Sequence, residues 1–97
     1  METLRRYFQE KSTVQLAILF GSHARGSQDR RSDIDLLVVH RTSRDFFRRY
    51  QDFPELWDMF PCAIDLLSYT PEEWEKVKDR RFFQQILKEG ILLVGPT

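Results

Sequence analysis

The sequence predicts an α+β, or mixed α/β, fold with a small mixed sheet of about four strands flanked by helices. Four apolar runs have the length and composition of strands, and most segments between them have helical spacing or helix caps. The chain of 97 residues has the size of one domain, so residues 1–97 are expected to share a single modest core. The predicted order is helix, strand, strand, helix, strand, helix, strand.

The first helix and the first strand follow from the spacing of apolar residues. Leu4, Tyr7 and Phe8 lie at positions i, i+3 and i+4, which predicts an amphipathic helix over about residues 2–11. Residues 14–20 are apolar with little alternation, which is typical of a strand covered on both faces. The sheet is therefore expected to carry helices on one or both sides.

Three further apolar runs complete the sheet. Residues 33–39 and 62–67 predict the second and third strands, and the polar residues 27–32 predict a loop before the second strand. Residues 91–94 predict a short last strand, which we expect at an edge of the sheet.

The helices of the second half have recognisable ends. Thr42 or Ser43 can cap a helix with an aromatic stripe. Residues 70–73 read Thr-Pro-Glu-Glu, a capping box with proline at the first helical position, which is the clearest helix start in the chain. That helix is expected to break near Asp79, or to be two helices in succession, and to end at Gly90.

Three aspartates suggest a metal site on the sheet. Asp33 and Asp35 are separated by one residue in a predicted strand, so their side chains point to the same face. Two carboxylates that face the same way suit a hard divalent cation. Asp65 lies in the third strand, and the three carboxylates converge if that strand lies beside the second. The alternative is a set of ordinary solvent-facing acids, although aspartate is depleted in strands.

A glycine–serine pair follows the first strand. Gly21 permits a tight turn and lets the backbone approach a triphosphate, and Ser22 can cap a short helix whose amides attract anions. A plain strand-to-helix turn is the alternative, and both interpretations can hold together. Arg25 lies one turn further and can bind phosphate through its guanidinium fork, or it can pair with Asp29 on the surface.

After the first predicted strand, the chain reads Gly21-Ser22-His23-Ala24-Arg25-Gly26 and later Asp33-Ile34-Asp35. This pattern resembles the minimal nucleotidyltransferases of the polymerase-beta-like superfamily. That family combines a Gly-Ser pair, a spacer of about this length, Asp-x-Asp and a later aspartate on a strand. The resemblance covers the chain from about Val14 to its end and implies the nucleotidyltransferase fold. It implies that two Mg²⁺ ions are held by the catalytic residues Asp33, Asp35 and Asp65. It implies that the nucleoside triphosphate, ATP by analogy, is bound by Gly21, Ser22 and Arg25.

The resemblance also implies a reaction and a partner. Minimal nucleotidyltransferases are antitoxins that transfer AMP to a tyrosine of a HEPN-domain toxin, which suggests a type VII-like toxin–antitoxin pair and a hetero-oligomer. One alternative is a binding module that neutralises its partner by contact alone. Another is a transferase that acts on a small molecule or an RNA end.

Composition narrows the partners. Fifteen basic and fifteen acidic residues cancel, which argues against indiscriminate binding of nucleic acid. No apolar run approaches the roughly 20 residues that cross a bilayer, and the N-terminus has no signal-peptide apolar region. Cys62 is the single cysteine, so an internal disulfide is excluded and a cytoplasmic location is expected.

The segment 41–60 is rich in arginine and aromatic residues. Arg41, Arg44 and Arg48 have helical spacing and are expected on a solvated face, with an acidic partner surface or RNA as the alternative. The aromatic side chains are expected to be mostly core, with the remainder forming a homodimer or partner patch. These aromatic residues are Phe46, Phe47, Tyr50, Phe53, Trp57 and Phe60.

Overall fold

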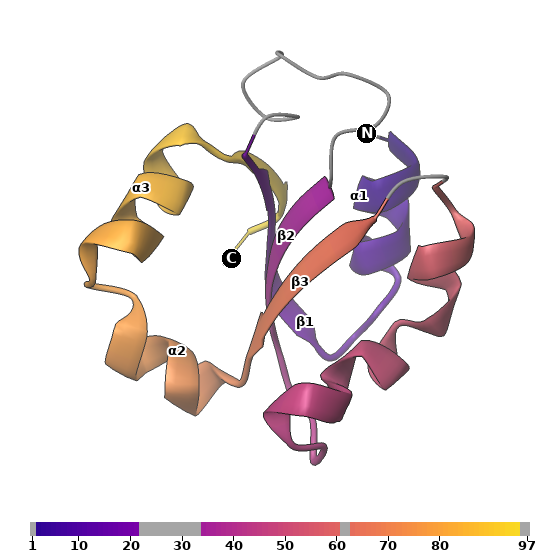
Figure 1. Cartoon of the computed structure of the whole chain (residues 1–97), viewed down its shortest axis with the longest axis horizontal. Helices are drawn as coiled ribbons and strands as arrows, with labels where there is room; N and C mark the ends of the chain where they lie inside the picture. Colours follow the sequence, from indigo (N-terminus) through magenta and orange to yellow (C-terminus); the bar gives the residue numbers. More distant parts are fainter. Residues whose placement is uncertain (1, 22–33, 61–62, 96–97) are drawn as a thin grey trace.

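The sheet of the computed structural model is mixed and four-stranded, as predicted (Figure 1). The structure describes residues 2–21, 34–60 and 63–95. Among the residues and segments named above, those outside the described ranges include Ser22, Arg25, Asp29, Asp33 and Cys62, the short helix predicted after Gly21 and the loop predicted over residues 27–32.

The strand order across the sheet is β3-β2-β1-β4. The strands are β1 (Val14–Phe20), β2 (Ile34–His40), β3 (Ile64–Tyr69) and β4 (Ile91–Val94). β1 pairs antiparallel with β2 and β4, whereas β2 and β3 run parallel. The edge position predicted for the last strand is therefore confirmed, and the third strand lies beside the second, which is the condition for the aspartates to converge.

Helices cover both faces of the sheet (Figure 1). One face carries α1 (Glu2–Gln9) and the 3₁₀ helices η1 (Phe46–Asp52) and η2 (Pro54–Asp58), and the other face carries α2 (Pro71–Val77) and α3 (Arg81–Glu89). The side chains of β2 point alternately to the two faces of the sheet. Leu36 and Val38 pack under α1, whereas Leu37 and Val39 pack under α3. This double burial explains why the central strands are apolar without alternation.

The α-helix predicted after Thr42 or Ser43 is wrong. The segment begins at Phe46 and forms two short 3₁₀ helices, the second of which starts at Pro54. The Thr42 hydroxyl caps no helix; it donates to the Asp52 carboxylate and accepts from the backbone N–H of Arg44 at 3.1 Å. Proline has no backbone N–H and its ring collides with the preceding turn, so one continuous α-helix cannot pass through Pro54.

The helices α2 and α3 confirm the predicted capping box at Thr70, the break near Asp79 and the helix end at Gly90. The Thr70 hydroxyl accepts from the Glu73 N–H at 3.2 Å, and the Glu73 carboxylate accepts from the Thr70 N–H at 2.9 Å, which completes the capping box. α3 ends before Gly90, but Gly90 has an extended backbone rather than a left-handed one. A Cβ there would lie 2.3 Å from the Ile18 side chain, so close packing requires this glycine.

The aromatic residues of segment 46–60 are mostly exposed, contrary to prediction. Phe53 is buried in the core under α1. Four others form an aromatic patch on η1 and η2, which we define as Phe46, Phe47, Tyr50 and Trp57. The three arginines at 41, 44 and 48 are exposed, as predicted. None of the helices in the described ranges has the length and apolar character needed to cross a membrane.

Arg49 is buried, unlike its arginine neighbours, and it ties three elements together. Its guanidinium donates to both Glu73 carboxylate oxygens, at 2.6 and 3.0 Å, and to the backbone carbonyls of Ser68 and Arg44, each at 3.1 Å. Glu73 thus caps α2 and pairs with η1 at once. The hydrogen bond from Arg49 lowers the pKa of Glu73 to about 2.

The neighbouring His40 is also fully buried, and its Nε2 atom shares a hydrogen bond with the Ser68 hydroxyl. Its Nδ1 atom lies 3.9 Å from the Asp52 carboxylate and has no hydrogen-bond partner. Burial lowers the pKa of His40 below its ordinary 6.5. The imidazole is therefore neutral in the folded protein at pH 7.

Stability should fall in two steps as pH decreases. The His40 imidazole and the Glu73 carboxylate both have lower pKa values in the folded than in the unfolded protein. The unfolded state therefore binds more protons, and acid favours unfolding. The contribution of His40 is complete above pH 6.5 and is lost below it. The contribution of Glu73 is complete above its ordinary 4.5 and is lost as pH falls toward 2. Urea unfolding between pH 8 and pH 3 measures both steps; a flat profile from pH 7 to pH 5 would contradict the first.

Candidate active site

Asp35 and Asp65 lie side by side on the two parallel strands. They are direct register partners in the β2–β3 pair, and neighbouring strands are about 4.8 Å apart. Leu37 and Leu67, two residues further along each strand, pack in the cluster under α2 and α3, so both carboxylates belong to that same face. The predicted convergence is thus observed for two of the three aspartates, and Asp33 lies outside the described residues.

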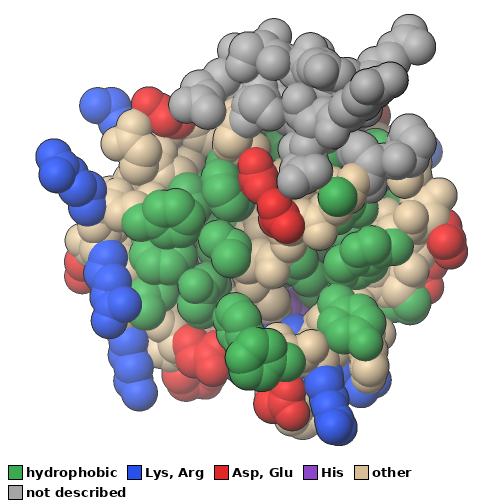
Figure 2. Space-filling model, in the orientation of Figure 1, with side chains coloured by type: hydrophobic (Ala, Val, Ile, Leu, Met, Phe, Trp, Pro, Cys, Tyr) green, Lys and Arg blue, Asp and Glu red, His purple; other side chains and the backbone are tan. Residues whose placement is uncertain are grey.

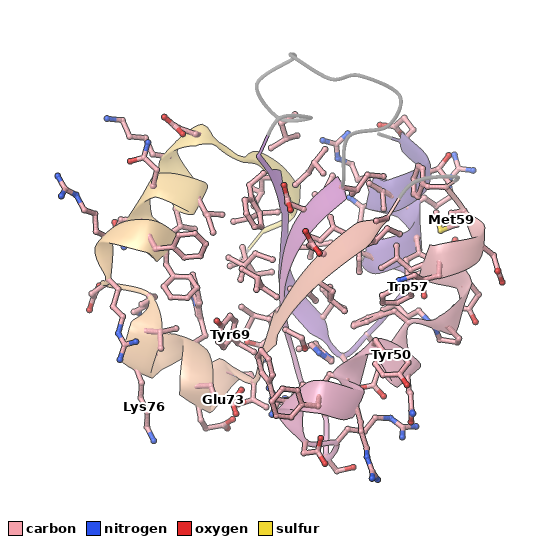
Figure 3. All side chains as sticks on the ribbon, in the orientation of Figure 1. Tyr50, Trp57, Met59, Tyr69, Glu73 and Lys76 are labelled. Carbon is pink, nitrogen blue, oxygen red and sulfur yellow. The ribbon has the colours of Figure 1, made fainter. Side chains whose placement is uncertain are left out.

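The acidic pair lies at the end of this face where β2 and β3 begin. Asp35 and Asp65 are the second residues of their strands; Asp65 is exposed and Asp35 is partly exposed. At the other end of β3, the Tyr69 ring packs against Phe46 and Phe83, with centroids 6.1 and 5.4 Å apart. Figure 3 shows Tyr69 beside Glu73 at that lower end, and Figure 2 shows acidic side chains bordered by hydrophobic ones higher on the face. The exposure of Asp65 and the partial exposure of Asp35 leave both carboxylates in contact with solvent.

Gly21 brings the backbone against the acidic pair. It directly follows Phe20, the register partner of Asp35, and it has a positive φ of 76°. A Cβ at Gly21 would lie 2.2 Å from the Asp35 Oδ2 atom, which no real contact allows. The predicted tight turn is confirmed, and its position is adjacent to the carboxylates.

Replacing Gly21 by alanine should destabilise the protein through Asp35. The left-handed backbone costs a residue with a Cβ about 1–2 kcal/mol, and the overlap with the carboxylate adds to that cost. Urea unfolding should give a smaller loss for Gly21→Ala when Asp35→Ala is also present, because the overlap is gone. Gly95→Ala is the control, since its Cβ meets only the flexible Leu92 side chain. Strictly additive effects of the two substitutions would contradict the close approach.

The donor set of this end fits a hard cation. Asp35 and Asp65 offer carboxylate oxygens, which Mg²⁺ prefers, on adjacent strands of a rigid sheet. Across residues 2–21, 34–60 and 63–95, no three His, Cys, Asp or Glu side chains are grouped to hold a metal ion. The described residues therefore supply two candidate ligands, and the predicted third, Asp33, lies outside them.

Phe20 lies beside Asp35 on the neighbouring strand and Phe82 packs on Phe20, and no local pattern in the sequence singles out either ring. Phe20 is the β1 partner of Asp35, and its ring meets the Phe82 ring edge to face, with centroids 6.3 Å apart. Phe82 is 54% exposed although it lies beside the core residue Phe83. Only the packing of α3 on β1 reveals that Phe82 meets the strand partner of Asp35.

Known proteins that resemble this chain include a family of nucleotidyltransferases. Residues 2–96 match the family model described as Polymerase beta, Nucleotidyltransferase. A candidate protein adenylyltransferase of Methanocaldococcus jannaschii is 32% identical over 63 residues, which are 65% of this chain and 64% of that protein.

Two solved structures share the fold. A toxin–antitoxin structure with AMP-PNP has a TM-score of 0.71 at 25% identity and aligns with 99% of this chain and 73% of its own. A tri-AMPylated Shewanella oneidensis HEPN toxin in complex with an MNT antitoxin has a TM-score of 0.59 at 22% identity, over 98% and 73% of the two chains. The second likeness speaks for the fold alone.

Proposed function

The chain belongs to the polymerase beta family of nucleotidyltransferases, and we propose that it transfers AMP from ATP to a tyrosine hydroxyl of a HEPN-domain toxin. One observation carries the proposal: Asp35 and Asp65 stand in register on one face, with the Gly21 turn against them. In this role the protein is the antitoxin of a type VII-like pair and works in a hetero-oligomer with its toxin.

The carboxylates and the glycine turn have distinct roles in this reaction. Asp35 and Asp65, with Asp33, would hold Mg²⁺, which when bound supplies positive charge to the phosphate oxygens. The Gly21–Ser22 turn binds the β- and γ-phosphates, because only glycine lets the backbone approach so closely. The tyrosine oxygen attacks the α-phosphorus, the bond to the bridging oxygen breaks, and pyrophosphate leaves. Asp65 accepts the hydroxyl proton as general base.

The donor and the acceptor are inferred from the relatives. One structural neighbour was solved with AMP-PNP, an ATP analogue, and another neighbour holds a tri-AMPylated HEPN toxin. The M. jannaschii relative is a candidate protein adenylyltransferase. These relatives favour ATP over other triphosphates and a protein over a small molecule or an RNA end.

The aromatic patch favours a second candidate function, neutralisation by contact alone. Phe47 is 85% exposed, and a groove of about 410 Å³ is lined by Tyr50, Gln51, Pro54 and Trp57 (Figure 3). A surface with this much exposed aromatic area is typical of protein interfaces. In this case the chain would bind a partner without modifying it.

Label transfer distinguishes the two functions. The chain is incubated with its cognate HEPN protein, Mg²⁺ and ATP labelled on the α-phosphate, and we expect the label on a tyrosine of that protein. ATP labelled on the γ-phosphate is the control, because its label should leave as pyrophosphate. Neutralisation of the toxin without any label would favour the contact function, whereas turnover without the HEPN protein would indicate a small molecule or an RNA end as acceptor.

A further inference from the structure

An aromatic wall, which we define as Phe20 and Phe82, stands beside the acidic pair. The two rings meet edge to face at 89°, and Phe82 also contacts Phe83 with centroids 5.1 Å apart. Phe83 is buried and serves the core, whereas Phe82 is 54% exposed. Phe82 therefore presents ring surface to solvent that packing of the core does not require.

The wall is placed by the same register that places the acids. Phe20 is the β1 partner of Asp35 and the residue before Gly21, so one end of the wall lies next to both Asp35 and the turn. Phe20 lies one strand spacing, about 4.8 Å, from Asp35, and the ring centroids of Phe20 and Phe82 are 6.3 Å apart. Hydrophobic side chains border the acidic ones on this face in Figure 2. A nucleoside whose α-phosphate lies at the acids could span this distance.

We propose that Phe82, supported edge-on by Phe20, stacks on the nucleobase of the donor nucleotide. The inference rests on the proposed function, since it takes the acids as the site of the α-phosphate. A flat base suits an exposed ring, because base–aromatic stacking gains energy from π-faces as well as from buried area. The acceptor is the less suitable occupant, because the wall adjoins the Gly21 turn where the donor is held. Stacking on a ring also tolerates any base, so the wall sets affinity rather than base choice.

Two ligands separate base binding from phosphate binding. Calorimetry measures the Kd of Mg·ATP and of Mg·tripolyphosphate, which has the phosphates but no base. We expect Phe82→Ala to weaken the binding of Mg·ATP about tenfold and to leave the binding of Mg·tripolyphosphate unchanged, since tripolyphosphate has no base to stack on the ring. Phe82→Trp should restore binding. Leu87→Ala is the matched control, because it removes another exposed apolar side chain of α3, 41% exposed, without touching the wall.

Other effects of Phe82→Ala on the binding of the two ligands would contradict the proposed contact with the base. An equal effect of Phe82→Ala on the two ligands, or no effect on either, would overturn the base contact while the proposed function stands. Unchanged Mg·ATP binding with slower labelling of the HEPN protein would assign the ring to the acceptor and also overturn it. Failure of the unsubstituted chain to bind either ligand would refute the proposed function itself, and the inference with it.

Discussion

Asp35→Asn should lower the rate of AMP transfer by about 10²–10³-fold, and Asp65→Asn should have a comparable effect. Asparagine preserves the shape of the side chain but removes the negative charge that holds a cation and, at Asp65, the group that accepts the proton of the attacking hydroxyl. Removal of one electrostatic contact to a developing charge typically costs this much. The two carboxylates lie on different strands and would contact a shared cation from different sides, so we expect neither to replace the other. The initial rate of label transfer at saturating ATP measures the effect.

The control for this prediction is Asp79→Asn. Asp79 is an exposed acid between α2 and α3, so its neutralisation changes the net charge equally without changing the site. Size-exclusion chromatography with the HEPN protein should show an intact complex for all three variants. If the Asp33→Asn, Asp35→Asn double variant still neutralised the toxin in that complex, binding alone would explain the function.

Arg49→Met should lower the free energy of unfolding by about 3 kcal/mol. Methionine keeps much of the buried stem, but it leaves two backbone carbonyls and the Glu73 carboxylate without their donor. Breaking a buried pair on one side typically costs about 3–5 kcal/mol, and the half-exposed Glu73 can regain water, which favours the lower end. In a domain of this size the melting temperature should fall by more than 10 °C, at about 4–8 °C per kcal/mol.

The neighbouring arginine provides a matched control. The Arg48 side chain is 72% exposed and lies 3.9 Å from the Asp45 carboxylate, so Arg48→Met should change stability by about 0.5 kcal/mol or less. Circular dichroism during thermal and urea unfolding measures both variants. Arg49→Met should also flatten the loss of stability between pH 4.5 and pH 2, because the Glu73 pKa returns toward its ordinary value. Equal effects of the two substitutions would show that the buried contacts of Arg49 contribute little.

Local patterns predicted most of the fold because they depend on neighbours in the chain. The apolar run of β1 and the capping box at Thr70 were read correctly, since strand burial and helix caps leave their mark within a few residues. The α-helix expected after Thr42 was wrong, because Pro54 prevents one continuous helix and the Thr42 hydroxyl bonds Asp52 instead of capping a helix. The exposure of Phe47 was also unexpected, since periodicity shows which side chains share a face but not what covers it.

The sequence by itself determined which residues were candidates: the alternation that gives Asp33 and Asp35 one face, the glycine of the turn, and Asp65 in another apolar run. Only the tertiary structure decided that β3 lies parallel to β2 in the register that sets Asp65 beside Asp35. It alone brought Gly21 against Asp35, buried Arg49 in its pair with Glu73 and packed Phe82 on Phe20, the strand partner of Asp35. The physical reason is that register and helix docking arise from side chains far apart in the chain, which no local spacing records.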